Sequence, residues 1–387
     1  MAPTGYLSAT GIEKAIAHLA ITWPDLCQRL PLPEATSEGR AMSALRLTAP
    51  RPPGPGPARP GLLLVAGLHA REVVNPDLLV MLAVRLCSAS AAGAGLSLGA
   101  KAYSAAQVKR ILTGLELYIL PCANPDGRAF VLSPDGDAWW RKNRRPTVPP
   151  HVGVDLNRNF DFLWPSGIGT SADPADYQVY KGQAPFSEAE TRNLRHLLES
   201  YPIAAMVDVH SYSELVLWPW GDDEIQGIDP AMNFANPAFD GHRGVIGDGY
   251  REFMPDLDRH WFERAGAAMR DAIAAVRGRS YSIQASSSLY PTSGCSNDWA
   301  YARHRVDGAA RKVWAFAVET GREFQPPYDE ARQVMDEASA GLLALGLSLA
   351  GPRVRPWKAE KPVRPSAPRR LAEPGPTRKR RRKAVPA

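Results

Sequence analysis

Two histidines and two glutamates of this sequence are of the types that bind metal ions and move protons. His69 and Glu72 are three residues apart in one segment, whereas His210 and Glu319 each follow a separate apolar run. A catalytic zinc ion takes three protein ligands and keeps a fourth position open for water, and two imidazoles with one carboxylate form such a set. His69, His210 and Glu72 together would make such a set for one zinc ion per chain. Glu319 would be a free carboxylate that acts as a base.

Each of these segments taken alone has a simpler interpretation. A histidine and a glutamate three residues apart occur often by chance as a surface pair, and a single histidine at a strand end is usually structural. The metal-site hypothesis therefore depends on the three segments coming together.

Alternating apolar runs and amphipathic stretches predict the elements that must position these residues. A short continuous apolar run indicates a strand, whereas a longer stretch with apolar residues every three to four positions indicates a helix. The predicted strands are 44–47, 62–65, 117–120, 204–209 and 313–318, and the predicted helices are 12–19, 76–86, 187–199, 261–276 and 331–349. The helix over 187–199 has a capping-box pattern, with Ser187 as the predicted N-cap and Glu190 three residues later.

Strands that alternate with helices predict the α/β class. We expect a single globular domain, residues 1–350, with a mixed, mostly parallel twisted sheet flanked by helices on both faces. Ligands of open α/β sheets bind beyond the carboxyl ends of the strands. The three candidate segments follow the predicted strands at that end.

The charge is concentrated at the end of the chain. Residues 351–387 carry 13 Lys/Arg against 2 Asp/Glu, a balance of +11, and since the whole chain is +6, residues 1–350 carry −5. This Pro/Arg-rich tail predicts a disordered basic extension. Because the body is acidic overall, we expect no nucleic-acid partner for it, the alternative being that the tail alone anchors the protein to nucleic acid.

The four cysteines and the N-terminus indicate a compartment. Cys27, Cys87, Cys122 and Cys295 form no CxxC pair, so a cysteine zinc site is not expected. The first residues lack a basic region followed by an apolar run, and no apolar stretch is long and uncharged enough to span a bilayer. We expect a cytoplasmic monomer without a membrane partner, with export by an unconventional route as the alternative.

Several sequence blocks resemble the M14 family of zinc carboxypeptidases and occur in the family's order. The blocks are Gly67–Glu72, Asn124–Gly127, Trp140–Arg144, Val154–Asn159, His210–Ser213, Tyr290–Gly294, Asn297–Trp299 and Ala317–Glu319. The resemblance extends over roughly residues 5–350.

The resemblance implies roles around the metal. It assigns His69, Glu72 and His210 as the zinc ligands and Glu319 as the general base. Asp155 matches the carboxylate that holds the first ligand histidine, a contact that fixes the imidazole tautomer.

The resemblance also implies how substrate is held. Asn157 and Arg158 match the clamp for a terminal carboxylate, for which a planar guanidinium is suited. Arg144 matches the arginine that stabilises the developing oxyanion. Arg71 matches an auxiliary substrate contact. The alternative for each arginine is an ordinary solvated position on a basic loop.

Further matched residues would line the peptide cleft. Tyr290 resembles a mobile tyrosine that closes over substrate, and Ser211 and Tyr212 match cleft residues. Asn297 lies where the family places the floor of the specificity pocket, and a neutral amide there leaves the preferred side chain open. The family also has cis peptide bonds at the positions of Ser211–Tyr212 and Pro219–Trp220.

The implied function is a zinc-dependent metallocarboxypeptidase that hydrolyses the C-terminal bond of peptides with a free carboxylate. A zinc-activated water would attack, with a glutamate as general base. The alternatives are an enzyme of the same type acting on cell-wall peptides with γ-D-glutamyl or diaminopimelate linkages, or a catalytically silent relative that binds peptides.

Residues 221–260 are expected to be an insertion that walls the cleft or forms a surface loop.

Overall fold

The fold is known from a computed structural model that describes residues 5–51 and 58–351. The predicted basic tail lies outside these ranges except for its first residue, Gly351. The predicted domain boundary at residue 350 therefore stays a prediction.

Eight strands form one sheet in the order β1-β2-β6-β3-β7-β12-β8-β11. Their bounds are β1 (Cys27–Pro31), β2 (Ser43–Leu47), β3 (Gly61–Ala66), β6 (Glu116–Leu120), β7 (Ile203–His210), β8 (Leu215–Trp218), β11 (Ser282–Ala285) and β12 (Trp314–Glu319). The four neighbouring strands β6, β3, β7 and β12 are parallel to one another, and β8 is parallel to β11. The other neighbours are antiparallel. The predicted mixed, mostly parallel sheet is confirmed.

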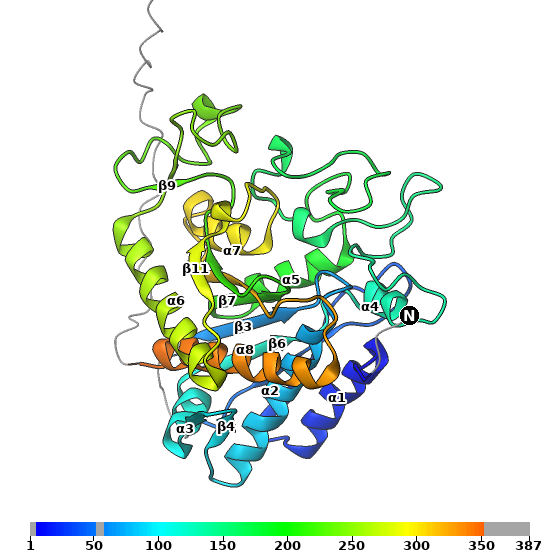
Figure 1. The fold of residues 1–387 in the computed structure, drawn as a ribbon, viewed down its shortest axis with the longest axis vertical. Coiled ribbons are helices and arrows are strands. Elements are labelled where there is room, and N and C mark those ends of the chain that lie inside the picture. Colours follow the sequence, from blue (N-terminus) through cyan, green and yellow to red (C-terminus); the bar gives the residue numbers. More distant parts are fainter. Residues whose placement is uncertain (1–4, 52–57, 352–387) are drawn as a thin grey trace, which may run out of the picture.

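Helices cover both faces of the sheet. Figure 1 shows α1, α2 and α8 on one side and α5 and α7 on the other, with α6 packed against α8. The helices are α1 (Ala9–Thr22), α2 (Val74–Ala91), α3 (Ala105–Gly114), α4 (Pro125–Val131), α5 (Ala189–Ser200), α6 (Asp256–Arg277), α7 (Ser296–Val306) and α8 (Tyr328–Leu349). This arrangement explains why β3 and β7 are almost continuously apolar: a strand covered on both faces has no side left for water.

All five predicted strands and all five predicted helices are present, with boundaries that differ by a few residues. Within the eight-stranded sheet, the strands that the pattern missed are β1, β8 and β11. In β1 two neighbouring residues are exposed, and no residue of β11 is fully buried, so neither has a continuous apolar run. The strand β8 is apolar but only four residues long.

The predicted capping box of α5 is wrong. The helix begins at Ala189 with Glu188 as N-cap, and no side chain caps it. The Ser187 hydroxyl instead donates to Glu188 Oε1 at 2.7 Å and accepts from Asn159 Nδ2 at 2.9 Å. The Ser187 hydroxyl, which the local sequence predicted to cap the helix, is therefore bonded to the side chains of Asn159 and Glu188 instead.

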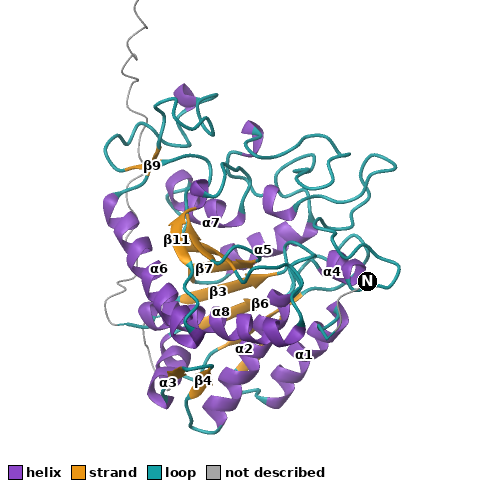
Figure 2. Ribbon diagram, viewed as in Figure 1, coloured by secondary structure: helices purple, strands orange, loops and turns teal. Residues whose placement is uncertain are grey.

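Residues 221–260 form a projecting segment that is mostly loop (Figure 2). It contains a two-stranded parallel sheet of β9 (Ile225–Gln226) and β10 (Glu252–Phe253). A second small sheet, β4 (Leu96–Leu98) with β5 (Lys101–Tyr103), lies between α2 and α3. Neither small sheet contributes to the eight-stranded one.

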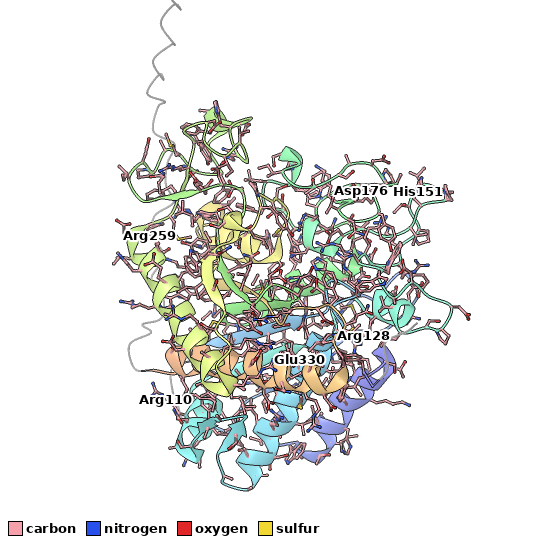
Figure 3. The ribbon with its side chains drawn as sticks, in the orientation of Figure 1. Arg110, Arg128, His151, Asp176, Arg259 and Glu330 are labelled. Carbon is pink, nitrogen blue, oxygen red and sulfur yellow. The ribbon has the colours of Figure 1, made fainter. Side chains whose placement is uncertain are left out.

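One described helix, α2, has the length and hydropathy of a membrane span, but 67% of its residues are buried inside the fold. It is therefore a core helix. Its first turn is tied to α4 by Arg128 (labelled in Figure 3), which forms an ion pair with Asp77 and donates to the Val73 carbonyl at 3.1 Å. These contacts fix the chain just after the segment that contains His69.

Candidate active site

Three neighbouring parallel strands bring the candidate segments together. β7 lies between β3 and β12, and all three run in the same direction. In the ladder Ala66 is paired with Val209, and His210 is paired with Glu319. The carboxyl ends of β3, β7 and β12 therefore meet at one edge, as the sequence predicted.

The turn after β3 places His69. Gly67 has a φ of +74°, and a Cβ there would lie 3.0 Å from the Pro76 ring, so both conformation and space favour glycine. The Asn124 side chain donates to the carbonyls of Leu68 and Lys142, each at 3.0 Å. These bonds join the turn to the chain after β6 and hold the backbone on either side of the site.

His69, Glu72 and His210 form one buried cluster whose ligand atoms all lie within 4.8 Å of one another. His69 Nδ1 is 2.6 Å from Glu72 Oε1, and His210 Nδ1 is 3.1 Å from both His69 Nδ1 and Glu72 Oε2. A tetrahedral zinc ion with bonds of about 2.0–2.1 Å separates its ligands by roughly 3.3 Å. The donor set and its spacing therefore fit a zinc ion.

A carboxylate lies behind each of the two rings. Asp155 Oδ1 is 3.3 Å from His69 Nε2, close enough for an ionic contact although not aligned as a hydrogen bond. Asp208 Oδ2 is 3.0 Å from His210 Nε2. A carboxylate favours a proton on the nitrogen that faces it. Both Nδ1 atoms are then left as metal donors.

The electrostatics of the cluster are those of a site for a cation. Burial alone would raise the pKa of Glu72, but His69 and His210 hold the pKa well below its usual value. Burial would lower the pKa of His210, but Asp208 and Glu72 raise that pKa well above the ordinary value. The protein atoms by themselves thus draw positive charge to this point.

Glu319 lies at the end of β12 beside His210 and is not a member of the cluster. Burial raises its pKa to about 8, opposed by His210 and Arg141 and reinforced by Glu72. A carboxyl with a pKa near neutrality can both accept and return a proton. This is the behaviour expected of the predicted general base.

Among the described residues Arg144 makes no contact with the metal cluster, and its role at the oxyanion stays a prediction. Its guanidinium lies 3.8 Å from the centre of the Phe130 ring, and its Nε is 3.7 Å from Glu38. Arg141, three residues earlier, contacts Asp155 instead and acts on the pKa of Glu319. The guanidinium of Arg144 thus stacks on aromatic rings beside the loop, whereas that of Arg141 pairs with a carboxylate.

Arg158 is buried next to the cluster. Its Nη1 donates to the Asn157 carbonyl at 2.7 Å and its Nε to the Gly169 carbonyl at 3.2 Å. Within residues 5–51 and 58–351, no carboxylate lies within ion-pair distance of its guanidinium. A Cβ at Gly294 would lie 2.4 Å from the Arg158 carbonyl, so glycine allows the two segments to touch.

Asn157 lies between Arg158 and the metal cluster. Its Oδ1 accepts the Ser296 N–H at 2.9 Å, and its Nδ2 is 3.3 Å from His210 Nε2. Tyr290 is half exposed, and its hydroxyl interacts with Arg158, whose pKa is raised despite burial. Cys295 is also close, with its Sγ 3.5 Å from Arg158 Nη1.

Phe324 contacts two of the remaining predicted substrate-binding residues. Arg71 lies 4.4 Å from the centre of the Phe324 ring, and the Tyr212 ring packs edge-on against Phe324 at 4.8 Å. Ser211 is buried and its N–H donates to Glu72 Oε2 at 3.1 Å. The peptide bonds Ser211–Tyr212 and Pro219–Trp220 are both cis, as the resemblance implied.

Asn297 is buried at the start of α7. Its Nδ2 donates to Ser286 Oγ at 3.2 Å, and that hydroxyl donates to the Trp218 carbonyl at 3.0 Å. The amide thus links α7 to the end of β8. Its predicted position on a pocket floor stays a prediction.

Comparison with known proteins identifies the family. The model of the family described as zinc carboxypeptidase, M14, matches residues 12–341. The chain belongs to the zinc carboxypeptidase family. It is a metallocarboxypeptidase, a zinc-dependent hydrolase, and the expected enzyme class and cofactor are confirmed.

Curated members of this family are similar over most of the chain. Carboxypeptidase B of Astacus astacus is 30% identical over 305 residues, which cover 77% of this chain and 82% of the relative. Zinc carboxypeptidase A 1 of Anopheles gambiae is 29% identical and carboxypeptidase A4 of Mus musculus 28% identical, over 70% and 74% of this chain. The matched regions span only 51% and 58% of those two relatives.

Solved structures show the same zinc carboxypeptidase fold. Thrombin-activatable fibrinolysis inhibitor superposes with a TM-score of 0.70 at 21% identity, covering 89% of this chain and 74% of that one. A carboxypeptidase A from Helicoverpa armigera gives a TM-score of 0.66 at 21% identity, over 89% and 73%. At this identity the likeness concerns the fold alone.

Sequence reasoning missed two charged residues of this carboxypeptidase's site. Arg141 could have been found in the same basic block, although the pattern alone did not separate it from Arg144. Asp208 precedes His210 by two residues, and strand alternation places both side chains on one face. That spacing was the available signal.

Proposed function

We propose that this protein is an exopeptidase that removes single residues from the C-terminal end of peptides. The observation that supports the proposal most directly is Arg158, a buried guanidinium beside the metal cluster without an ion-pair partner among the described residues. A buried arginine of this kind suits the free carboxylate of a substrate, which it can bind through two hydrogen bonds. Binding there would place the last peptide bond near the cluster.

His69, Glu72 and His210 would hold the zinc ion. When bound, zinc polarises the scissile carbonyl and lowers the pKa of a bound water. Glu319 is suited to take a proton from the attacking water and to return it to the departing amine, because it lies beside His210 at the end of β12 and is not one of the ligands.

Arg141 replaces Arg144 as the proposed oxyanion arginine. Its Nη2 and Nε contact Asp155 Oδ2 at 2.9 and 3.0 Å, which fixes the guanidinium next to the buried cluster. A positive charge held in place before the reaction stabilises negative charge that develops on a carbonyl oxygen without having to reorganise. Tyr290, Arg71 and Tyr212 would contact the rest of the peptide.

We further propose that the enzyme works as a monomer in the cytoplasm. For the compartment the support is chemical: the four cysteines are all free and buried, and cytosolic proteins keep their thiols reduced. The Cys27 and Cys87 sulfurs are 3.3 Å apart without a bond.

A mixed library of linear peptides, analysed by mass spectrometry with and without a chelator, tests the proposal. We expect stepwise loss of single C-terminal residues that the chelator abolishes, and no cleavage of the same peptides with amidated C-termini. Cleavage of internal bonds would overturn the exopeptidase assignment. An intact library from a protein that holds one zinc would redirect the search to cell-wall peptides.

A further inference from the structure

Asp208 is a buried carboxylate directly behind the second histidine of the metal cluster. It lies on β7 two residues before His210, so the two side chains project from the same face of the strand. Its Oδ2 is 3.0 Å from His210 Nε2, and neither residue is more than marginally exposed.

The charge of Asp208 is not neutralised by another cation. In the described part of the chain, His210 is the only basic group within ion-pair distance of it, and its Oδ1 accepts no hydrogen bond. Its other contact is neutral: the Ser296 hydroxyl donates to Oδ2. Asp155 differs, since Arg141 binds its Oδ2. A buried, unneutralised carboxylate is costly, and its negative charge acts on the nearest ring.

Asn157 presents a competing contact to the same ring nitrogen. Because Asn157 Oδ1 accepts the Ser296 N–H at 2.9 Å, its Nδ2 faces His210 Nε2 at 3.3 Å. An amide donor would favour a bare Nε2, whereas the carboxylate favours a protonated one. The carboxylate contact is shorter and charge-assisted, so the proton belongs on Nε2.

We propose that Asp208 is a positioning residue that holds His210 in the Nε2-protonated form and thereby strengthens zinc binding. Each histidine ligand then has its own carboxylate, Asp155 for His69 and Asp208 for His210. The inference rests on the assignment of these histidines as zinc ligands. Carboxylates that hold ligand histidines typically contribute about 10- to 100-fold in metal affinity.

Zinc affinity of the full-length protein tests this without any substrate. Metal-free wild type and Asp208→Asn are titrated with zinc against a chromophoric chelator of known affinity. We expect the dissociation constant of Asp208→Asn to be about 10- to 100-fold higher. Asp155→Asn serves as the comparison at the other histidine, and Asp271→Asn, an exposed aspartate on α6, as the control that leaves affinity unchanged.

A second measurement uses only the wild-type protein, in case Asp208→Asn does not fold. Histidine-selective ¹⁵N NMR of the zinc-loaded enzyme identifies which ring nitrogen of His210 carries the proton. We expect Nε2–H, with its proton resonance displaced far downfield by the carboxylate. A proton on Nδ1, or a folded Asp208→Asn with zinc affinity within about twofold of wild type, would overturn the proposal. Because no peptide is involved, failure of the peptidase assay would leave both results interpretable.

Discussion

Asp155 bridges His69 and Arg141 with its two carboxylate oxygens. Oδ1 lies 3.3 Å from His69 Nε2, while Oδ2 accepts from Arg141 Nε and Nη2 at 3.0 and 2.9 Å. Burial would raise the pKa of Asp155, but Arg141 and His69 hold the pKa far below its usual value. One ionised aspartate therefore orients both a metal ligand and the arginine proposed to stabilise the oxyanion.

The two neighbouring arginines should respond differently to substitution. We expect Arg141→Gln to lower kcat/KM by about 100- to 1,000-fold, as loss of one oxyanion contact does. Arg144→Gln should leave kcat/KM within about threefold of wild type and reduce the free energy of unfolding by about 0.5–1 kcal/mol, because its contact with the Phe130 ring is lost. Steady-state kinetics and urea unfolding of the two variants measure both effects. The reverse order of activity loss would restore the original assignment of Arg144.

Glu319→Gln should separate metal binding from turnover. The glutamine cannot accept a proton, so we expect kcat/KM to fall by about 100- to 10,000-fold. Zinc content should stay at one ion per chain, because Glu319 is not in the ligand cluster. Metal analysis and peptide hydrolysis on the same preparation provide the measurement, with Glu323→Gln, an exposed residue nearby, as control. Retention of the wild-type rate would remove Glu319 from the mechanism.

Arg158→Gln should weaken recognition of the free C-terminus. Losing one partner of a buried, charge-assisted pair costs about 2–4 kcal/mol, which corresponds to roughly 30- to 1,000-fold in kcat/KM. We expect the preference for free-acid over amidated peptides to shrink by a similar factor. Arg195→Gln, an exposed arginine on α5, is the matched control. If the preference stayed intact in Arg158→Gln, another group would have to bind the carboxylate.

Glu190 should make the stability of the protein depend on pH. Burial, reinforced by Glu188, raises its pKa from 4.5 to about 8. The folded state therefore holds a proton that the unfolded chain releases, and stability falls as pH rises from about 4.5 to about 8. In Glu190→Gln this loss of stability should be absent. Near pH 8 the free energy of unfolding of Glu190→Gln should therefore exceed that of wild type by about 1–3 kcal/mol.

Urea unfolding of the zinc-loaded protein at several pH values measures the effect. Glu199→Gln, exposed on the same helix, should keep the wild-type pH dependence. Equal slopes for wild type and Glu190→Gln across this range would show that the carboxyl is not held protonated by the fold.

The sequence predicted the fold class from local pattern, and it predicted the metal ligands from the resemblance of several blocks to one family. Continuous apolar runs at 62–65, 204–209 and 313–318 identified strands covered on two faces, and in a parallel sheet such strands end at one edge. His69 and Glu72 lie in the turn after β3, and His210 is the last residue of β7.

Only the tertiary structure decided which long side chains reach the site. Arg141 and Arg144 share one basic loop, but the first pairs with Asp155 and the second packs on Phe130. Ser187 leaves its predicted cap for Asn159 and Glu188 in the same way. Long or polar side chains choose among partners that lie far away in sequence, so their positions are set by packing and electrostatics that no local pattern contains.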